Sequence, residues 1–272
     1  MFPYDFTYHR VITVAEAVAL GAGLPDGKFL AGGQTLVQTM KLRLAAPTDL
    51  IDLDGVRELK GVALEGEHVV IGAMSRHAEV QNASVVRGAI PALAHLASEI
   101  GDRQVRNRGT IGGSLANNDP AADYPAAVLG LDAVIVTNER AIDADSFFVG
   151  LYETALRSGE LITSVRFPMP HRAGYVKFKN PASGFATVGV FVADFGSTIR
   201  VAVTGAGPAV FRLREAEALL QRCFAPQALN AVVVPADGLN SDLQASAAYR
   251  AHLIPVIARR AVAIALGKED AC

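Results

Sequence analysis

The chain has 272 residues, 51% of them apolar and 19% charged, and a formal net charge of −2. This profile is typical of a well-packed protein of one large or two ordinary domains, and the balanced charge excludes the basic footprint of a nucleic-acid-binding protein. Two cysteines cannot provide a disulfide framework or the clustered thiolates of an iron–sulfur centre.

The N-terminus and the apolar segments predict a protein that neither enters the secretory pathway nor spans a membrane. Residues 1–5 lack the basic-then-apolar form of a signal peptide. The longest apolar stretch, residues 124–136, contains Asp132 and is too short to cross a bilayer. Low cysteine use is typical of a reducing compartment, so we expect a cytoplasmic location. The six scattered histidines indicate no metal site.

Before residue 170 the hydrophobic pattern changes repeatedly between helical and extended periodicity. Thr13, Ser75 and Asp119 are predicted to cap helices, and Gly66-Glu67 is predicted to form the turn of a hairpin. The predicted helices are residues 13–22, 35–44, one that begins at 76, 86–100, 120–131 and 146–156, and the predicted strands are 28–31, 49–53, the hairpin 62–74, 133–136 and 160–167.

After Pro168 and Pro170 the pattern changes to short strands separated by glycine turns. These strands are expected to form an antiparallel sheet, because consecutive strands tend to pair. The sequence therefore predicts an α+β fold with a domain boundary near residue 170, and so domains at residues 1–170 and 171–272. The predicted strands here are 175–179, 187–193, 198–205 and 209–213, and helices 214–222 and 245–266 are expected to cover them.

Two glycine-rich segments stand out in the first domain. The first, Ala31-Gly32-Gly33-Gln34-Thr35, joins a predicted strand to a predicted helix, where unpaired amides point outward. The second, from Arg106 to Asp123, is predicted to be a loop, because it has too few apolar side chains for a core strand. Successive amides in glycine turns form concave anion sites, here expected at Gly32-Gly33 and Gly112-Gly113. A single glycine pair is usually only a turn, but two pairs beside hydroxyl groups indicate a large phosphate-bearing cofactor.

Polar side chains beside the glycines extend this prediction. Thr35, Thr110 and Ser114 add hydroxyl donors, and Asn117 can both donate and accept. Asp123 is expected to accept hydrogen bonds from ribose or ribityl hydroxyls, because a carboxylate repels phosphate. No dinucleotide G-x-G-x-x-G motif, P-loop, serine hydrolase or zinc peptidase motif is present.

Other candidates have ordinary structural interpretations. Arg106 and Arg108 either contact phosphate or fix the long segment through carboxylate pairs. The remaining expectations are exposure to solvent for Lys177, surface or capping roles for His77 and His95, and core packing for Phe178 and Phe185.

The order and spacing of these segments resembles the FAD-binding (medium) subunits of the xanthine dehydrogenase and carbon monoxide dehydrogenase family of molybdenum hydroxylases. The resemblance covers nearly the whole chain, and residues 104–123 are its most specific part. The other matching motifs are Ala31-Gly32-Gly33-Gln34-Thr35, Lys41-Leu42-Arg43, Leu50-Ile51-Asp52-Leu53, Ile71-Gly72-Ala73-Met74 and Glu160-Leu161-Ile162.

The resemblance implies a two-part PCMH-type FAD-binding domain followed by a smaller α+β domain of the CO dehydrogenase flavoprotein type, which contains an antiparallel sheet. It implies that Ala31 to Thr35 wrap the FAD pyrophosphate. It also implies that Ile100 packs against the isoalloxazine ring and that Ile162 and Lys177 make further flavin contacts, with Lys177 near the polar edge of the ring. The second clamp implied by the resemblance consists of Thr110, Ile111, Gly112, Gly113, Ser114 and Asp123, with Asn117 close by.

In this family the flavin subunit is a relay, so the resemblance implies an FAD-dependent oxidoreductase subunit without catalytic side chains of its own. It implies partners in a dimer of heterotrimers: a large molybdopterin-binding subunit and a small subunit with [2Fe-2S] clusters. Two alternatives remain: a stand-alone FAD-dependent oxidase or reductase acting on a small substrate, and a non-catalytic interaction protein that kept the fold without the cofactor. The sequence specifies neither the substrate nor the acceptor among NAD, a quinone, oxygen and a carrier protein.

Overall fold

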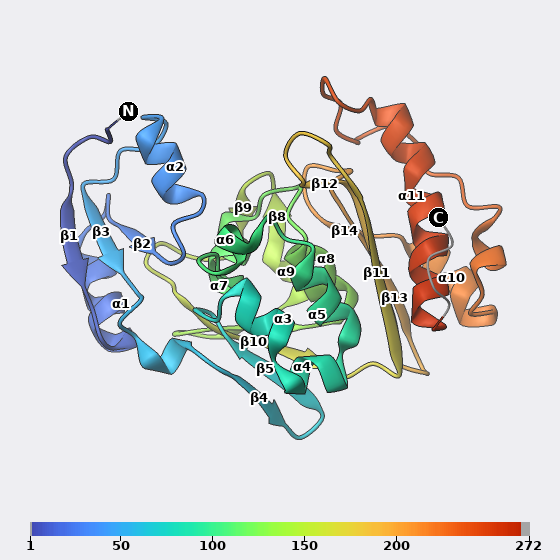
Figure 1. The fold of residues 1–272 in the computed structure, drawn as a ribbon, viewed down its shortest axis with the longest axis horizontal. Helices are drawn as coiled ribbons and strands as arrows, with labels where there is room; N and C mark the ends of the chain where they lie inside the picture. Colours follow the sequence, from blue (N-terminus) through green and yellow to red (C-terminus); the bar gives the residue numbers. More distant parts are fainter. Residues whose placement is uncertain (1, 268–272) are drawn as a thin grey trace.

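The structure, a computed structural model, describes residues 2–267, which form three larger sheets, a two-stranded ribbon and the helices that pack on them (Figure 1). The N-terminal unit is a three-stranded parallel sheet in the order β1-β3-β2. Its helices lie in the connections, because parallel strands cannot be joined by a tight turn. Its elements are β1 (Thr7–Arg10), α1 (Val14–Gly23), β2 (Lys28–Leu30), α2 (Leu36–Lys41) and β3 (Asp49–Asp52).

The central unit is a five-stranded antiparallel sheet in the order β4-β5-β10-β6-β7. Apolar residues from these strands and from the neighbouring helices form the largest hydrophobic core. The elements are η1 (Arg57–Leu59), β4 (Val62–Glu65), β5 (His68–Gly72), α3 (His77–Asn82), α4 (Ser84–Ala89), α5 (Pro91–Ser98), α6 (Arg103–Arg106), α7 (Ile111–Asn117), α8 (Tyr124–Gly130), β6 (Val134–Thr137), β7 (Ala141–Asp143), α9 (Ala144–Phe147), β8 (Phe148–Gly150), β9 (Glu153–Thr154) and β10 (Ile162–Pro168).

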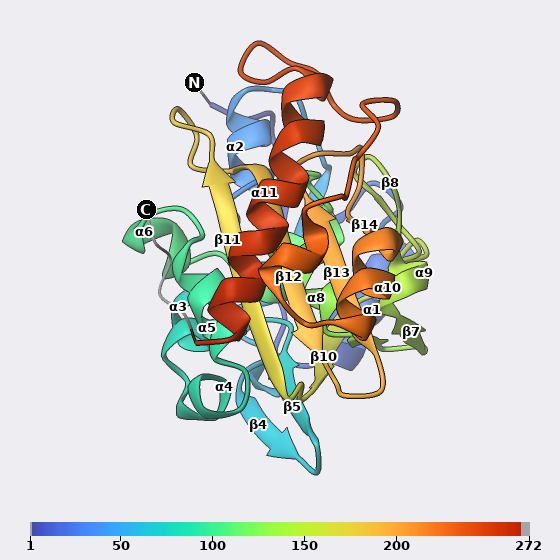
Figure 2. The ribbon, with the colours of Figure 1, turned by 90° about the vertical axis from the view of Figure 1, so that its right-hand side faces the viewer.

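The C-terminal unit is a four-stranded antiparallel sheet in the order β11-β12-β13-β14. Helices α10 and α11 cover its outer face, and α5 and α8 of the central unit pack on its inner face (Figures 1 and 2). Because both faces are covered, every residue of β12 and β13 is buried. The elements are β11 (Arg172–Lys179), β12 (Ala186–Asp194), β13 (Ile199–Thr204), β14 (Phe211–Arg212), α10 (Arg214–Arg222), η2 (Pro226–Leu229) and α11 (Ala247–Ala265).

The central and C-terminal units share one hydrophobic core. Tyr175 and Phe191 of the C-terminal sheet belong to the same buried cluster as Tyr124 and Leu129 of α8. The buried Arg200 side chain crosses between the units and donates from Nε to the carbonyl of Leu129 at 2.8 Å. These contacts fix the C-terminal sheet against α8.

Most predicted elements are confirmed, and the α+β class with an antiparallel C-terminal sheet is confirmed with them. Thr13 caps α1 by accepting from the amide of Glu16, as its sequence position predicts. The single helix predicted at 86–100 is wrong, because the chain leaves the helix at Ile90 and Pro91 opens α5. Proline lacks the amide that a continuous helix needs.

Three further predictions between residues 75 and 156 are wrong. Ser75 does not cap α3, because its hydroxyl bonds both backbone groups of Gly61. Asp119 accepts from the amide of Ala121 in a turn, and the following helix begins only at Tyr124. Residues 146–156 form the end of α9 and the β8–β9 ribbon rather than a helix.

The predicted loop at 106–123 is also wrong in part, because it contains α7. Within residues 2–267, none of the helices combines the length and the apolar character that a membrane crossing requires. In the same range no group of three His, Cys, Asp or Glu side chains is arranged to hold a metal ion. Cys223 is exposed, and Cys272 lies outside the described residues.

The start of β10 is fixed by a buried carboxylate, and this generates a stability prediction. The Glu160 side chain is fully buried and accepts from Arg140 Nε at 2.9 Å and from the Thr137 hydroxyl at 2.8 Å. The Arg140 hydrogen bond is the main cause that lowers the pKa of Glu160 from 4.5 to about 2. We expect Glu160→Gln to lower the free energy of unfolding at pH 7 by roughly 2–3 kcal/mol.

The pH dependence follows from the lowered pKa of this carboxyl. Its stabilisation is fully present above pH 4.5 and is lost as the pH falls towards 2. Urea denaturation of both proteins at several pH values measures the difference, which should be constant above pH 4.5 and shrink below it. Glu139→Gln is the control and should change little, because its pair with Arg157 is largely exposed. A difference that does not vary with pH would contradict this assignment.

Candidate functional site

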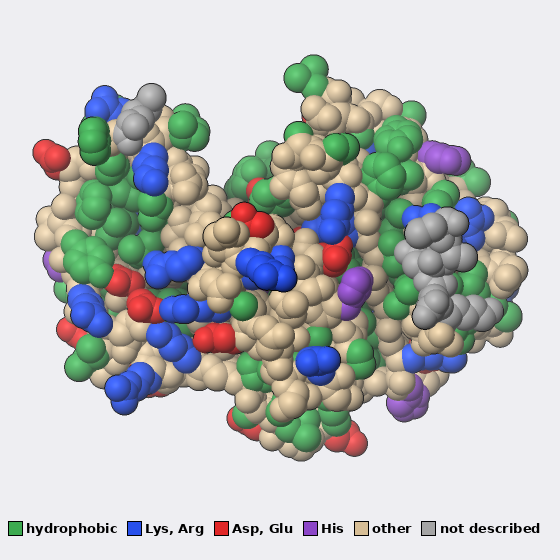
Figure 3. All heavy atoms as spheres, in the orientation of Figure 1, with side chains coloured by type: hydrophobic (Ala, Val, Ile, Leu, Met, Phe, Trp, Pro, Cys, Tyr) green, Lys and Arg blue, Asp and Glu red, His purple; other side chains and the backbone are tan. Residues whose placement is uncertain are grey.

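A cavity of about 600 Å³ lies between the N-terminal and central units. Figure 3 shows the surface hollowed between these parts of the molecule. This volume is within the range of about 300–1,000 Å³ that is usual for ligand and cofactor pockets. Its walls come from the segment after β2, from α7, from the start of β10 and from residues 183–185.

The first glycine segment contributes free backbone donors to this cavity. Gly33 has a φ of +72°, which glycine adopts readily, and this turns the chain from β2 into α2. Within residues 2–267, the backbone N–H groups of Gly32, Gly33, Gln34 and Thr35 have no hydrogen-bond acceptor. All four residues line the cavity. Such a run of unpaired amides favours an anionic ligand.

The glycines of both segments are required by the packing of the chain itself. A Cβ on Gly32 would lie 2.2 Å from the carbonyl oxygen of Arg108 and 2.7 Å from the Cα of Gly109. A Cβ on Gly112 would lie 2.6 Å from the Cβ of Ala73. The first glycine segment therefore contacts the residues that precede α7, and α7 in turn contacts the end of β5.

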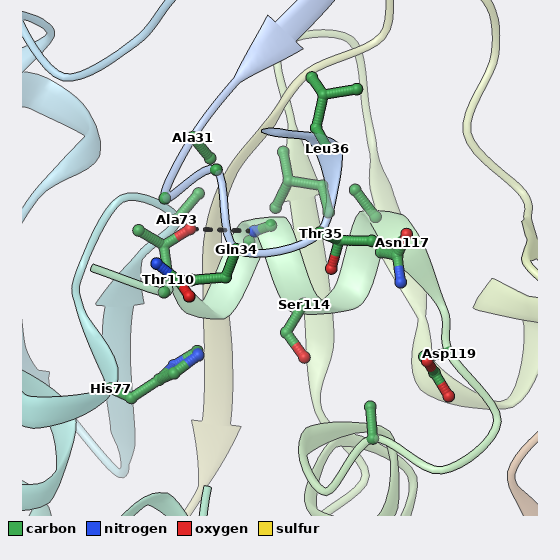
Figure 4. A pocket seen from close by; sticks show the side chains of 18 of the residues that line it. Ala31, Gln34, Thr35, Leu36, Ala73, His77, Thr110, Ser114, Asn117 and Asp119 are labelled. Atoms are coloured by element: carbon green, nitrogen blue, oxygen red, sulfur yellow. Dashed lines mark hydrogen bonds between the residues drawn. The ribbon is translucent and has the colours of Figure 1, made fainter. Parts of the chain in front are cut away.

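The anion site expected at Gly112-Gly113 is not formed, because both amides donate within the chain. Gly112 N donates to the carbonyl of Ala73 at 2.8 Å, the dashed line of Figure 4, and Gly113 N donates to the Thr110 hydroxyl at 3.2 Å. The polar groups that α7 presents to the cavity are side chains. Ser114 and Asn117 lie along the helix and line the cavity (Figure 4).

The predicted site residues mostly come together around this cavity. Ile111 is an exception, because it is fully buried in the central core. Lys177 is the other exception, because its side chain is 1% exposed and lies behind the cavity wall. The predicted residues that line the cavity are Ala31, Gly32, Gly33, Gln34, Thr35, Ile100, Thr110, Gly112, Gly113, Ser114, Asn117, Asp123 and Ile162.

A buried ion pair joins the cavity wall to the C-terminal sheet. Lys177 Nζ lies 3.0 Å from the carboxylate of Asp123 and donates to the carbonyl of Glu99 at 2.8 Å. The Tyr175 hydroxyl also donates to Asp123, which is 4% exposed. The expectation that Lys177 faces solvent is therefore wrong. A pairing across 54 residues of chain leaves no local signal in the sequence.

His77 is a cavity residue that the sequence assigned to a surface or capping role. It is 5% exposed, and its ring points toward Thr110 and Gln34 in Figure 4. Burial, with a smaller effect of Arg106, lowers the pKa of His77 to about 4, so the imidazole is neutral at pH 7. Its Nδ1 has no hydrogen-bond partner among the described residues.

Aromatic residues were also placed wrongly by the sequence. Phe178 and Phe185 are 38% and 46% exposed rather than core residues, and Phe185 lines the cavity. Tyr152 lines it too, although it lies in a segment predicted to be helical. Arg106 does fix its segment, but by donating to the carbonyls of Ile100 and Gly101 rather than to carboxylates.

The fold and the cavity define a protein that binds a large phosphate-bearing cofactor, and comparisons with known proteins identify its class. The family model described as "FAD binding domain in molybdopterin dehydrogenase" matches residues 4–170. The carbon monoxide dehydrogenase medium chain of Hydrogenophaga pseudoflava is 37% identical over 279 residues, covering 96% of this chain and 97% of the relative. The nicotine 6-hydroxylase medium subunit of Paenarthrobacter nicotinovorans is 35% identical over 269 residues, covering 94% and 95%.

Solved structures give the same result. Reconstituted CO dehydrogenase from Oligotropha carboxidovorans contains a chain with a TM-score of 0.90 and 34% identity, covering 98% of this chain and all of that one. The chain therefore belongs to the family of FAD-binding domains in molybdopterin dehydrogenases. It is an FAD-dependent oxidoreductase subunit of the medium-chain type.

The residues present fit FAD. The unpaired amides of residues 32–35 match the negative charge of a diphosphate, and the cavity volume suits a ligand of this size. The exposed surface of the lining is largely apolar, as is usual around planar ring systems, and polar side chains such as Thr110, Ser114 and Asn117 lie among the apolar ones.

The close contact of Gly32 generates a prediction. Gly32→Ala should lower the free energy of unfolding by about 1–3 kcal/mol, because the new Cβ meets backbone atoms of Arg108 and Gly109 that cannot move aside. Thermal unfolding of the chain measures the effect. Gly88→Ala in α4 is the matched control, since its Cβ position has no described atom within 4 Å apart from its chain neighbours and the backbone of its own helix, and it should be neutral or stabilising by up to about 1 kcal/mol. Unchanged stability of Gly32→Ala would contradict the packing described here.

Proposed function

We propose that this chain is the FAD-binding electron-transfer subunit of a molybdenum-containing hydroxylase or dehydrogenase. FAD, when bound, supplies redox chemistry, taking electrons from iron–sulfur clusters on a partner chain and delivering them to an external acceptor. The observation that carries the proposal is the run of unpaired amides at residues 32–35 on the wall of the cavity. The family membership of residues 4–170 supports it.

Within this proposal, each cavity wall has a role. The amides of residues 32–35 bind the diphosphate, and the side chains of Thr110, Ser114 and Asn117 bind polar groups beside it. Ile100 and Ile162 provide apolar surface for a ring of the cofactor. Gly112, Gly113 and Ile111 act through the backbone, because they position α7 against the central unit.

In this proposal the carboxylate of Asp123 and the ammonium group of Lys177 form an ion pair at the back of the cavity. Asp123 lines the cavity, while Lys177 holds its carboxylate from the side of the C-terminal sheet. A hydroxyl of the cofactor can still approach Asp123, since a carboxylate accepts up to four hydrogen bonds. Lys177 therefore influences the flavin through Asp123 rather than by projecting into the cavity.

The proposed partners are a large molybdopterin-binding subunit and a small [2Fe-2S] subunit, assembled as a dimer of heterotrimers in the cytoplasm. Support comes from relatives named as medium chains or subunits of dehydrogenase and hydroxylase complexes. We further propose domains at residues 1–170 and 171–272. The family model ends at residue 170, between the end of β10 and the start of β11.

The alternative is a stand-alone FAD-dependent oxidase or reductase, which needs an acid or base beside the flavin. His77 is the residue that favours it, because it is neutral, is part of the cavity wall and has no partner at Nδ1 in the described part of the chain. Anaerobic mixing of the purified FAD-loaded chain with small oxidisable substrates separates the two functions. Bleaching of the flavin absorbance by the chain alone would favour the oxidase. An unchanged spectrum that bleaches when the partner subunits are added supports the relay.

A charge placed among the unpaired amides tests the diphosphate assignment. Gln34→Glu should raise the dissociation constant of FAD about tenfold, because the new carboxylate repels the diphosphate, and the effect should decrease at high salt. Quenching of flavin fluorescence on titration of the apo-chain measures it. Gln38→Glu is the matched control, since Gln38 is exposed on α2 and does not line the cavity. Equal affinities for the two variants would contradict the assignment.

Co-purification tests the proposed complex. A tagged chain expressed in its native host should recover two further chains, with about one FAD, one molybdenum and several irons for each copy of this chain. Metal analysis and absorbance spectroscopy measure these ratios. Recovery of this chain alone, with FAD and steady turnover of a substrate, would contradict the relay.

A further inference from the structure

The β8–β9 ribbon carries a residue in a strained backbone conformation. Its turn contains Leu151 and Tyr152, and Tyr152 has a φ of +54°. This left-handed conformation is disfavoured for residues with a Cβ and is a genuine outlier for a bulky side chain. Strained residues of this kind persist where the surrounding structure imposes them, and they cluster at functional sites.

The ribbon is anchored to the end of α7, the helix that lines the cavity. Asn118 is fully buried, and its Nδ2 donates to the carbonyls of Gly150 at 2.9 Å and Glu153 at 2.7 Å. These two carbonyls flank the turn on either side. The Asn118 side chain therefore holds Tyr152 in place relative to the cavity wall.

The side chain of Tyr152 is largely exposed, so its burial does not explain the strain. It is 58% exposed and lines the rim of the cavity. Its hydroxyl makes one long hydrogen bond, 3.4 Å to the carboxylate of Asp119, which lines the same cavity. An aromatic ring that an anchored backbone places beside a ligand cavity, and that is largely open to water, is suited to stack on a planar ligand ring.

We propose that Tyr152 is a further cofactor-contact residue, whose ring covers the isoalloxazine ring of FAD at the rim of the cavity. This inference rests on the proposed function. The isoalloxazine is assigned rather than the adenine because the ring that exchanges electrons with a partner and an acceptor must lie near the surface. The adenine has no such requirement and can occupy the interior.

The test uses the full-length chain and measures two quantities: FAD affinity, which reports on loss of the ring, and the melting temperature, which reports on relief of the backbone strain. Tyr152→Gly removes the ring and also removes the backbone strain, because glycine adopts positive φ freely. We expect its apo form to melt at or above the wild-type temperature, while the dissociation constant of FAD rises about tenfold. Tyr152→Phe keeps the ring and should bind FAD within about twofold of wild type.

Two controls and one replacement variant complete the experiment. Arg43→Gly relieves a matching φ of +59° away from the cavity and should leave FAD affinity unchanged. Tyr152→Asn replaces the glycine variant if that variant does not fold, since asparagine tolerates this conformation. ADP, measured by competition with FAD, should bind wild type and Tyr152→Gly equally, because it lacks the isoalloxazine ring.

The outcomes separate this inference from the proposed function. Equal FAD affinity of wild type and Tyr152→Gly overturns the inference alone. Equal losses of FAD and ADP affinity also overturn it, because the covered ring is then the adenine. A wild-type chain that takes up no FAD overturns the proposed function, and the inference with it.

Discussion

The constraint on which the site depends is the absence of a side chain at Gly32. The backbone of the segment after β2 lies so close to Arg108 and Gly109 that a single methyl group would meet a carbonyl oxygen at 2.2 Å. This contact brings the N-terminal unit against the residues that open α7, and the cavity lies beside their junction. Among residues 2–267 the amides of residues 32–35 remain without partners, since this packing uses Cα atoms and carbonyls rather than N–H groups. The glycines are therefore needed for the packing of the chain. The N–H groups that this packing leaves without an acceptor are the groups available to bind a ligand.

A second constraint ties the cavity to the C-terminal sheet. Asp123 lies on the cavity wall, and its carboxylate is held by Tyr175 and Lys177 of β11. Lys177 also bonds the carbonyl of Glu99, next to Ile100 of the cavity wall. Removing one partner of a buried ion pair is strongly destabilising, because it leaves an uncompensated charge. The C-terminal sheet thus supports the cavity from behind, although in the described part of the chain its contribution to the lining is confined to residues 183–185, which connect β11 to β12.

The sequence predicted the elements whose signals are local. Thr13 identifies the start of α1, and alternation of apolar residues identifies the β4–β5 hairpin and β10, whereas β1 and β7 were not predicted. It failed where tertiary contacts decide the outcome. The helix α7 forms in spite of Gly112 and Gly113, because Ala73 and Ser75 accept its first amides and fix its start. The two glycine segments can be recognised in the sequence, because a close approach between two backbone segments requires glycine, which has no Cβ. The predictions for Lys177, His77 and Phe185 are wrong, because burial or exposure of a side chain depends on partners far away in the chain.

The central claim is that free amides in the first glycine segment bind the diphosphate of FAD. A crystal structure of the chain with FAD, with the phosphorus atoms located by their anomalous signal, tests it most directly. The account predicts diphosphate oxygens within about 2.7–3.2 Å of the backbone nitrogens of residues 32–35. A diphosphate bound elsewhere, with these amides turned towards water or other parts of the chain, would contradict it.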